Sequence, residues 1–147
     1  MGSTPEPTPL GAPAPPPATL QADVHGAEAA AHYAIDVLNQ ASVTGDTTTW
    51  TQITAPACVT CVSFASDIAA TGPDPGGTVR VASAKPTEID PGAFYTVALA
   101  VDQEPHTRAD GTTSSGGRYA LLFALRFTDT WIVEAIDVGA ADAPWAS

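Results

Sequence analysis

The spacing of apolar residues changes once along the chain, and this change predicts the fold class. From Gly26 to Val43 there is no proline, and apolar residues recur at helical spacing. A period of about 3.6 residues predicts one long amphipathic helix. After Gly77 the period falls to about two, which is typical of strands with one buried face. The apolar members of the helical pattern are Ala27, Ala30, Ala34, Val37, Leu38 and Ala41.

Two shorter helices are expected between the long helix and the strands. Gly45 favours the end of the first helix, because glycine adopts the left-handed conformation of a helix C-cap without steric cost. Asp46 is placed to cap a second helix that carries Trp50. Pro56 interrupts that helix, and a third helix is predicted over residues 57–70.

A meander of strands is predicted for the second half of the chain, over residues 79–85, 95–101, 119–127 and 131–136. Between them, residues 105–117 form a polar, glycine-rich connection that is long enough to be mobile. In the last strand, strict alternation places Trp131 and Ile136 on opposite faces. Helices followed by strands predict an α+β domain, with N-terminal helices packed on a curved, antiparallel, four-stranded sheet.

One predicted strand is apolar on both faces. Tyr119, Leu121, Phe123, Leu125 and Phe127 form one face of it, and Ala120, Leu122 and Ala124 form the other. A second apolar face needs a cover, which is either another segment of this chain or the same face of a second copy. A homodimer through the sheet face is therefore one expectation.

The N-terminal part differs in composition from the rest. Seven of the 14 prolines lie between residues 4 and 20, and proline favours extended, unpaired backbone. We therefore expect a disordered tether over residues 1–22, one domain over residues 23–140 and a C-terminal tail over residues 141–147. Residues 1–3, Met-Gly-Ser, are typical of a leader left by cloning, so we expect the natural N-terminus, with any membrane anchor, to lie upstream.

The charge limits the partners of the chain. The 147 residues carry a formal net charge of −11, which repels phosphate backbones and anionic lipids. Direct binding to nucleic acid is excluded on this ground, and contact with a membrane is expected only through an N-terminal lipid anchor. No apolar run approaches the ~20 residues of a membrane-spanning helix. We expect no cofactor and no metal.

Cys58 and Cys61 are the two cysteines of the chain, and three roles suit a pair at this spacing. A redox pair is typical of a βαβ context, whereas the segment before Cys58 is predicted to be helical. A zinc site needs further ligands, and His25, His32 and His106 are expected on unrelated elements. A structural disulfide in an exported protein is the favoured interpretation, with redox catalysis as the alternative.

Several motifs together resemble known proteins. They are the alanine-rich helix, Thr44-Gly45-Asp46, the Cys-x-x-Cys pair and the closing Trp131-Ile132-Val133-Glu134. Over residues 25–138 the chain resembles a family of uncharacterised actinobacterial lipoproteins and is similar to the nuclear-transport-factor-2-like, or cystatin-like, superfamily. The resemblance implies a secreted, lipid-anchored domain without an assigned activity. It also implies a bent sheet that closes with the helices over a conical pocket.

The same resemblance suggests two functions. In superfamily enzymes a pocket carboxylate or histidine moves a proton while tyrosines hold an oxyanion. The candidate pocket residues here are Tyr33, Asp36, Tyr95, Tyr119 and Arg126. They form no diagnostic catalytic motif, so the leading hypothesis is a non-enzymatic, extracytoplasmic domain that binds an unknown protein or small molecule at the cell envelope. The alternative is a small isomerase or dehydratase that uses a pocket carboxylate.

Overall fold

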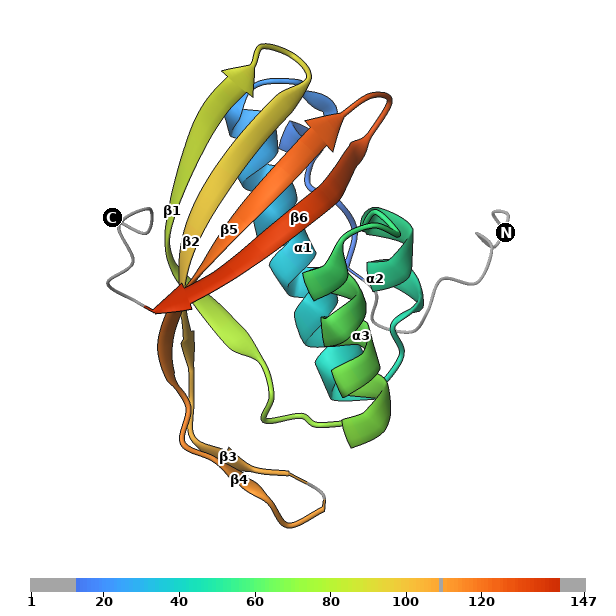
Figure 1. Ribbon diagram of the computed structural model, residues 1–147, viewed down its shortest axis with the longest axis vertical. Coiled ribbons are helices and arrows are strands. Elements are labelled where there is room, and N and C mark those ends of the chain that lie inside the picture. The colour runs from blue at the N-terminus through green and yellow to red at the C-terminus, as the bar shows by residue number, and fades with distance from the viewer. Residues whose placement is uncertain (1–12, 109, 141–147) are drawn as a thin grey trace, which may run out of the picture.

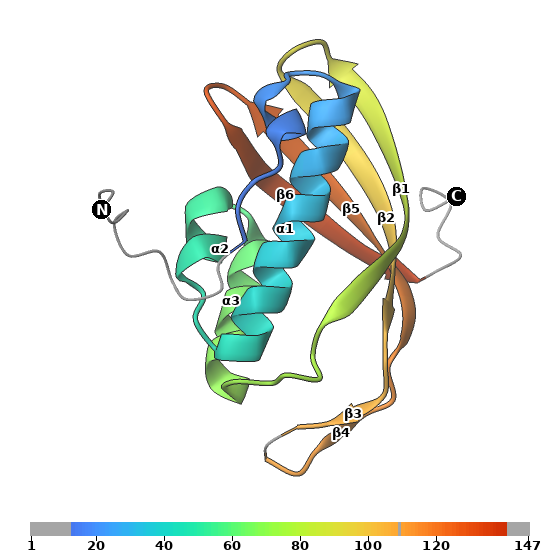
Figure 2. The same cartoon turned by 180° about the vertical axis from the view of Figure 1, so that it is seen from behind.

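The computed structural model describes residues 13–108 and 110–140, and its helices cover one face of an antiparallel sheet (Figures 1 and 2). The sheet has four strands in the order β1-β2-β5-β6. The expected α+β arrangement is confirmed. The elements are η1 (Pro17–Leu20), α1 (Val24–Thr44), α2 (Thr48–Ile53), α3 (Val59–Thr71), β1 (Val79–Asp90), β2 (Phe94–Gln103), β3 (His106–Thr107), β4 (Thr113–Ser114), β5 (Gly117–Phe127) and β6 (Trp131–Ala140).

Helix α1 forms as its sequence predicts. The carboxylate of Asp23 accepts a hydrogen bond from the Gly26 N–H at 2.9 Å and so caps the first turn. Gly45, with φ of 78°, ends the helix in the left-handed conformation. The alanines of its buried face let the helix lie close to the sheet, with Ile35 and Val37 adding bulk. No helix of the described residues is long and apolar enough to cross a membrane.

Helix α2 begins one residue later than the Asp46 cap predicts. Thr47 occupies the cap position without a side-chain hydrogen bond. Asp46 still serves the first turn, because its Oδ1 accepts from the Thr48 N–H at 2.9 Å and from the Thr48 hydroxyl at 2.6 Å. Both bonds hold the pKa of Asp46 below its usual range, and the bond from the Thr48 hydroxyl has the larger effect.

The core lies between α1 and the inner face of the sheet. Its largest fully buried side chains include Tyr95, Phe123, Leu99, Leu121 and Leu125 from the strands. Trp131 packs edge-on against Tyr95, with ring centroids 5.5 Å apart. The alternation predicted for residues 119–127 is confirmed, because the odd-numbered side chains of β5 belong to or pack against this core.

The alternation predicted for the last strand is wrong beyond Val133. Ala124 pairs with Ala135, but Leu125 pairs with Val133, so Glu134 is an extra residue in β6. Such a β-bulge shifts the phase of the side chains by one position. Trp131 and Ile136, predicted on opposite faces, are therefore both buried in the core, while Ala135 is exposed.

Strand β1 is longer than predicted. It runs through Pro86 to Asp90, whereas the expected range stops at residue 85. Proline cannot donate to a sheet ladder, but β1 is an edge strand and pairs only with β2 within the described residues. Residues 105–117, expected to be an irregular connection, contain the two-stranded β3–β4 hairpin that projects beyond the sheet in Figure 1.

Residues 17–22, which the sequence assigns to the tether, lie against the domain. The Trp131 indole N–H donates to the Thr19 carbonyl at 3.0 Å, and the Tyr95 hydroxyl donates to the Ala22 carbonyl at 3.0 Å. A Cβ at Gly26 would collide with the Gln21 carbonyl oxygen, which shows how closely this segment crosses α1. Residues 1–12 and 141–147 lie outside the described residues, so the disordered tether and the tail stay predictions there.

Candidate functional site

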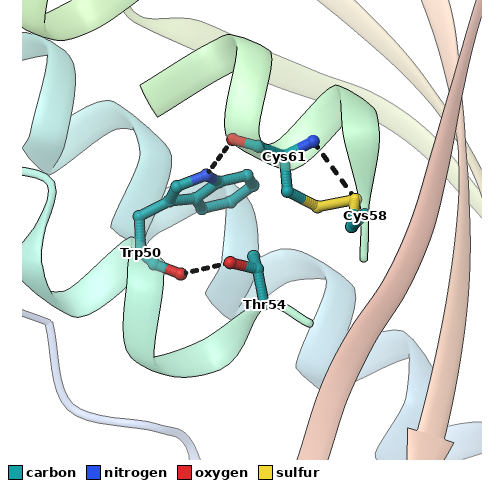
Figure 3. The surroundings of a disulfide bond; sticks show 4 residues. All are labelled: Trp50, Thr54, Cys58 and Cys61. Carbon is teal, nitrogen blue, oxygen red and sulfur yellow. Dashed lines mark hydrogen bonds between the residues drawn. A yellow bond between two sulfur atoms is a disulfide. The ribbon is translucent and has the colours of Figure 1, made fainter. Parts of the chain in front are cut away.

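The two cysteines form a disulfide at the corner between α2 and α3 (Figure 3), which confirms the disulfide part of the favoured interpretation, while export stays a prediction. Cys58 occupies the N-cap of α3, and its sulfur accepts from the Cys61 N–H at 3.1 Å. The Trp50 indole N–H donates to the Cys61 carbonyl at 3.0 Å, so the disulfide and α2 are held together. The Ala55 N–H then donates to the Val133 carbonyl at 2.8 Å and ties this corner to β6.

The position of the disulfide opposes redox catalysis. Cys58 and Cys61 are 2% and 1% exposed. Thiol–disulfide exchange needs direct attack of a thiolate on a sulfur atom, and burial blocks that approach. The corner instead supports a hollow of about 440 Å³ between α2 and α3, which is open to solvent and lined by Trp50, Val62 and Ala65 among others.

A second hollow lies where α1 and α3 meet the start of β1 and the end of β2. Its apolar lining includes Leu38 of α1, Phe64 of α3 and Leu121 of β5, and its volume is about 160 Å³. A neighbouring hollow of about 200 Å³ reaches the β3–β4 hairpin. The two have five lining residues in common and form one groove, which we call the α1/α3 groove. The shared residues are Ser42, Asp67, Ile68, Gly77 and Gln103.

Charged and polar side chains gather at the hairpin end of the α1/α3 groove. The His106 Nε2 lies 3.0 Å from the Asp74 Oδ2, and the Arg108 Nε lies 4.0 Å from the same oxygen. The side chains of His106 and Asp74 are only 9% and 13% exposed. A contact at this depth is less screened by solvent than a surface contact, so it fixes the hairpin to the loop before β1.

Both ring nitrogens of His106 face acceptors. Nε2 meets the Asp74 carboxylate, and Nδ1 lies 3.3 Å from the Glu104 carbonyl. Which of the two nitrogens donates depends on the tautomer of the ring. Both ring nitrogens lie against groups of the protein itself, so His106 is suited to holding the groove wall.

The remaining part of the groove offers groups to a ligand. Within the described residues, Asp67 has neither a hydrogen bond nor an ion pair, and it is exposed at the point where the two hollows join. Tyr119 lines the apolar hollow, and burial raises the pKa of its hydroxyl, which stays protonated at neutral pH. The groove thus combines an apolar floor, a carboxylate acceptor and a hydroxyl.

The five pocket residues suggested by the sequence do not share one hollow. Tyr119 lies in the α1/α3 groove, whereas Tyr33 lines a separate hollow of about 220 Å³ beside Trp131, and burial raises its pKa. Asp36 is exposed on α1. Tyr95 is fully buried, and its hydroxyl accepts from the Gly92 N–H at 2.8 Å.

Arg126, the fifth of these residues, lies on the outer face of the sheet, away from the helices. Its guanidinium stacks over the Phe94 ring at 5.1 Å, and its Nε lies 3.5 Å from the Glu134 Oε1. It therefore takes no part in either hollow.

Sequence reasoning missed Asp67, Asp74 and His106 as groove residues. Their sequence separations carry no spacing signal, because a loop, a helix and a hairpin bring them together only in the fold. His25 and His32, expected on unrelated elements, share α1. Among the described residues there is no group of three or more His, Cys, Asp or Glu side chains placed to hold a metal ion.

Comparison with known proteins gives a family but no activity. No curated protein and no solved structure matches the chain. One protein family matches residues 7–117, a range that includes all the helices, β1, β2 and the β3–β4 hairpin. The matched range includes only the first residue of β5, Gly117, and no residue of β6. The chain belongs to this family, which is described as a family of unknown function (DUF6318).

Proposed function

We propose that this chain is a non-enzymatic, extracytoplasmic binding domain of a lipoprotein, and that it holds a small molecule in the α1/α3 groove. The observation that carries the proposal is the composition of the groove, which has an apolar floor and an Asp67 carboxylate with no partner in the described part of the chain. Ligand sites commonly pair an apolar lining with a few polar groups that fix orientation.

The ligand class follows from the groups in the groove. Leu38, Phe64 and Leu121 favour an apolar body. Asp67 is an acceptor only, and it favours a basic or hydrogen-bond-donating head. The net charge of −11 adds a long-range attraction for cations and a repulsion for anions. A small amphipathic molecule with an amine or similar donor group fits this combination.

Catalysis by a pocket carboxylate is the weaker candidate. A general base of this kind is normally desolvated, which moves its pKa towards the working pH. Asp67 is exposed, and no Asp, Glu, His, Lys or Arg residue of the described part of the chain is buried. The order of three helices before a four-stranded sheet supports a likeness to the nuclear-transport-factor-2-like fold, whose members include both enzymes and binding modules.

The location at the cell envelope has separate support. Disulfides such as Cys58–Cys61 persist in proteins of oxidising compartments and are rare in proteins of reducing ones. The proline-rich start of the sequence suits a spacer between a lipid anchor and the domain. Fusion of the full-length gene to alkaline phosphatase tests the location, because the reporter folds only outside the cytoplasm. An inactive fusion that is nevertheless expressed would contradict it.

Binding is tested with two probes of equal chain length, octylamine and octanoate. We expect octylamine to raise the melting temperature of the protein more than octanoate does, because its ammonium faces Asp67. Asp67→Asn should remove the difference between the probes. Asp36→Asn, which changes an exposed carboxylate of α1 outside the groove, should keep it. Equal shifts with both probes, or a shift that survives in Asp67→Asn, would count against the proposal.

A further inference from the structure

The outer face of the sheet is laid out in rows that the strand register fixes. Side chains that pair directly across antiparallel strands lie on the same face. The middle row across the four strands consists of Lys85, Ala98, Leu122 and Asp137. The next rows on either side place Ala100 beside Ala120 and Thr96 beside Ala124. The centre of the face is therefore small and apolar.

The basic residues of the chain gather on this face. Four of the five Lys and Arg residues point outward from it, and they are Arg80, Lys85, Arg118 and Arg126. Carboxylates of the same face accompany them, and they are Asp90, Asp102, Glu134 and Asp137. The face is thus nearly neutral on a chain whose net charge is −11. It is the region where a second acidic copy meets the least repulsion.

We infer that the outer face binds the same face of a second copy of this chain, about a twofold axis that runs parallel to the strands between β2 and β5. A twofold axis in this direction sets β1 against β6 and β2 against β5 of the second copy, row by row. Lys85 then faces Asp137 of the second copy, and Asp102 faces Arg118. Leu122 of each copy faces Ala98 of the other.

The charges select this axis over the alternative. A twofold axis perpendicular to the strands would set Lys85 against Lys85 and Arg118 against Arg126. Like charges at an interface cost several kcal/mol, so that arrangement is disfavoured. Asp102 already binds Arg118 within one copy, at 2.6 and 2.9 Å. In the dimer the two such pairs meet as a four-membered network.

The size of the face predicts a weak dimer. With a rise of about 3.3 Å per residue and strands about 4.8 Å apart, ten-residue strands in a four-stranded sheet cover on the order of 600 Å² per copy. This planar area is an upper bound, because Ala98 and Ala120 at its centre are only 7% and 0% exposed in the single copy. A total of at most about 1,200 Å² is at the lower end of specific interfaces. The helices of the described residues all lie on the opposite face (Figures 1 and 2), so none of them obstructs the approach.

Sedimentation velocity over about 1 to 200 µM of the full chain tests the inference. We expect a dimer that forms with rising concentration. Lys85→Glu and Asp137→Lys should each weaken association by about tenfold or more. The double variant, which restores two opposite-charge pairs, should recover association to within about threefold of the parent. Asp36→Lys, which makes the same charge change as Asp137→Lys but on α1, should not weaken association.

Two results would overturn the inference, provided that thermal melts show each variant to be folded. One is a monomer at every concentration. The other is a double variant as weak as the two single ones, because that would disprove the pairing and hence the axis. A variant that ends at Ala140 tests the remaining alternative, which is that residues 141–147 and not a second copy occupy the face. If the full chain is monomeric and the shortened chain dimerises, residues 141–147 cover the face and the inference fails.

Discussion

The two faces of the four-stranded sheet are made by alternate residues of the same strands, yet their chemistry differs. The inner face carries buried aromatic and branched side chains such as Tyr95, Leu99 and Phe123 under α1. The outer face carries alanines and Leu122 at its centre, Phe94 and Ile132 towards one end, and most of the cations. The difference teaches that the inner face supplies the folding free energy, whereas the outer face leaves small, balanced groups for association.

The sharpest test of this comparison uses two neighbours in β5 that point to opposite faces. Phe123→Ala should reduce the free energy of unfolding by about 3–5 kcal/mol, because it opens a cavity in a fully buried site. Leu122→Ala on the outer face should cost only about 1 kcal/mol in the monomer, since Leu122 is half-buried. Urea denaturation at low protein concentration measures both. Equal losses would show that the outer face is covered in the monomer.

Removal of the disulfide should affect the inner layer alone. Replacement of both Cys58 and Cys61 by serine should lower the free energy of unfolding by roughly 2 kcal/mol, since the bond closes only a short loop of the unfolded chain. Association through the outer face should not change, because this corner touches the edge of β6 from the helix side. Chemical denaturation gives the first value and sedimentation the second. A large change in association would contradict the separation of the two faces.

Loss of the Tyr95 hydroxyl on the inner face should lower the stability measurably, whereas loss of the Thr96 hydroxyl on the outer face should not. Tyr95→Phe removes the group that bonds the Gly92 N–H and the Ala22 carbonyl, and it should cost about 1–2 kcal/mol. Thr96→Val, one residue along on the outer face, should change stability by less than about 0.5 kcal/mol. Hydrogen exchange of residues 17–22 should quicken only in Tyr95→Phe. Unchanged exchange there would show that other contacts, such as that of Trp131, hold this segment.

The smallest expected effect is the pH response of the outer face. The hydrogen bond from Arg118 lowers the pKa of Asp102, so the native carboxylate releases its proton at a lower pH than the unfolded one does. Its contribution is therefore complete above about pH 4 and is lost as the pH falls through the lowered native value. Asp102→Asn should lower the melting temperature slightly at pH 7, and the difference should shrink as the pH falls below about 4. A larger loss in acid would reverse the assigned sign.

Local signals in the sequence were sufficient for the three α-helices and for the order along the chain of the four strands of the main sheet. The left-handed Gly45 and the alanine spacing of α1 act within one helix, so the sequence pattern contains them. The Asp23 cap is equally local but was not predicted. The phase of β6 could not be read in this way. The Glu134 bulge depends on the pairing with β5, and it brings Ile136 into the core against the simple alternation.

The candidate site was predictable only in part. Tyr119, suggested as a pocket residue, lines the groove, but Asp67, Asp74 and His106 come from three elements whose approach no spacing reveals. Asp36 and Arg126 have chemistry that suits a pocket, yet one is exposed on α1 and the other lies on the outer face. Residue type alone does not say which side of an element is turned towards a hollow.

The sequence by itself determined the α+β class, the cysteine pair and the acidic charge, because composition, period and short-range caps are properties of neighbouring residues. Only the tertiary structure decided which groups share the α1/α3 groove and which cations share the outer face. Both depend on strand register and on the approach of distant segments. A shift of one residue in register would turn every side chain of a strand to the other face.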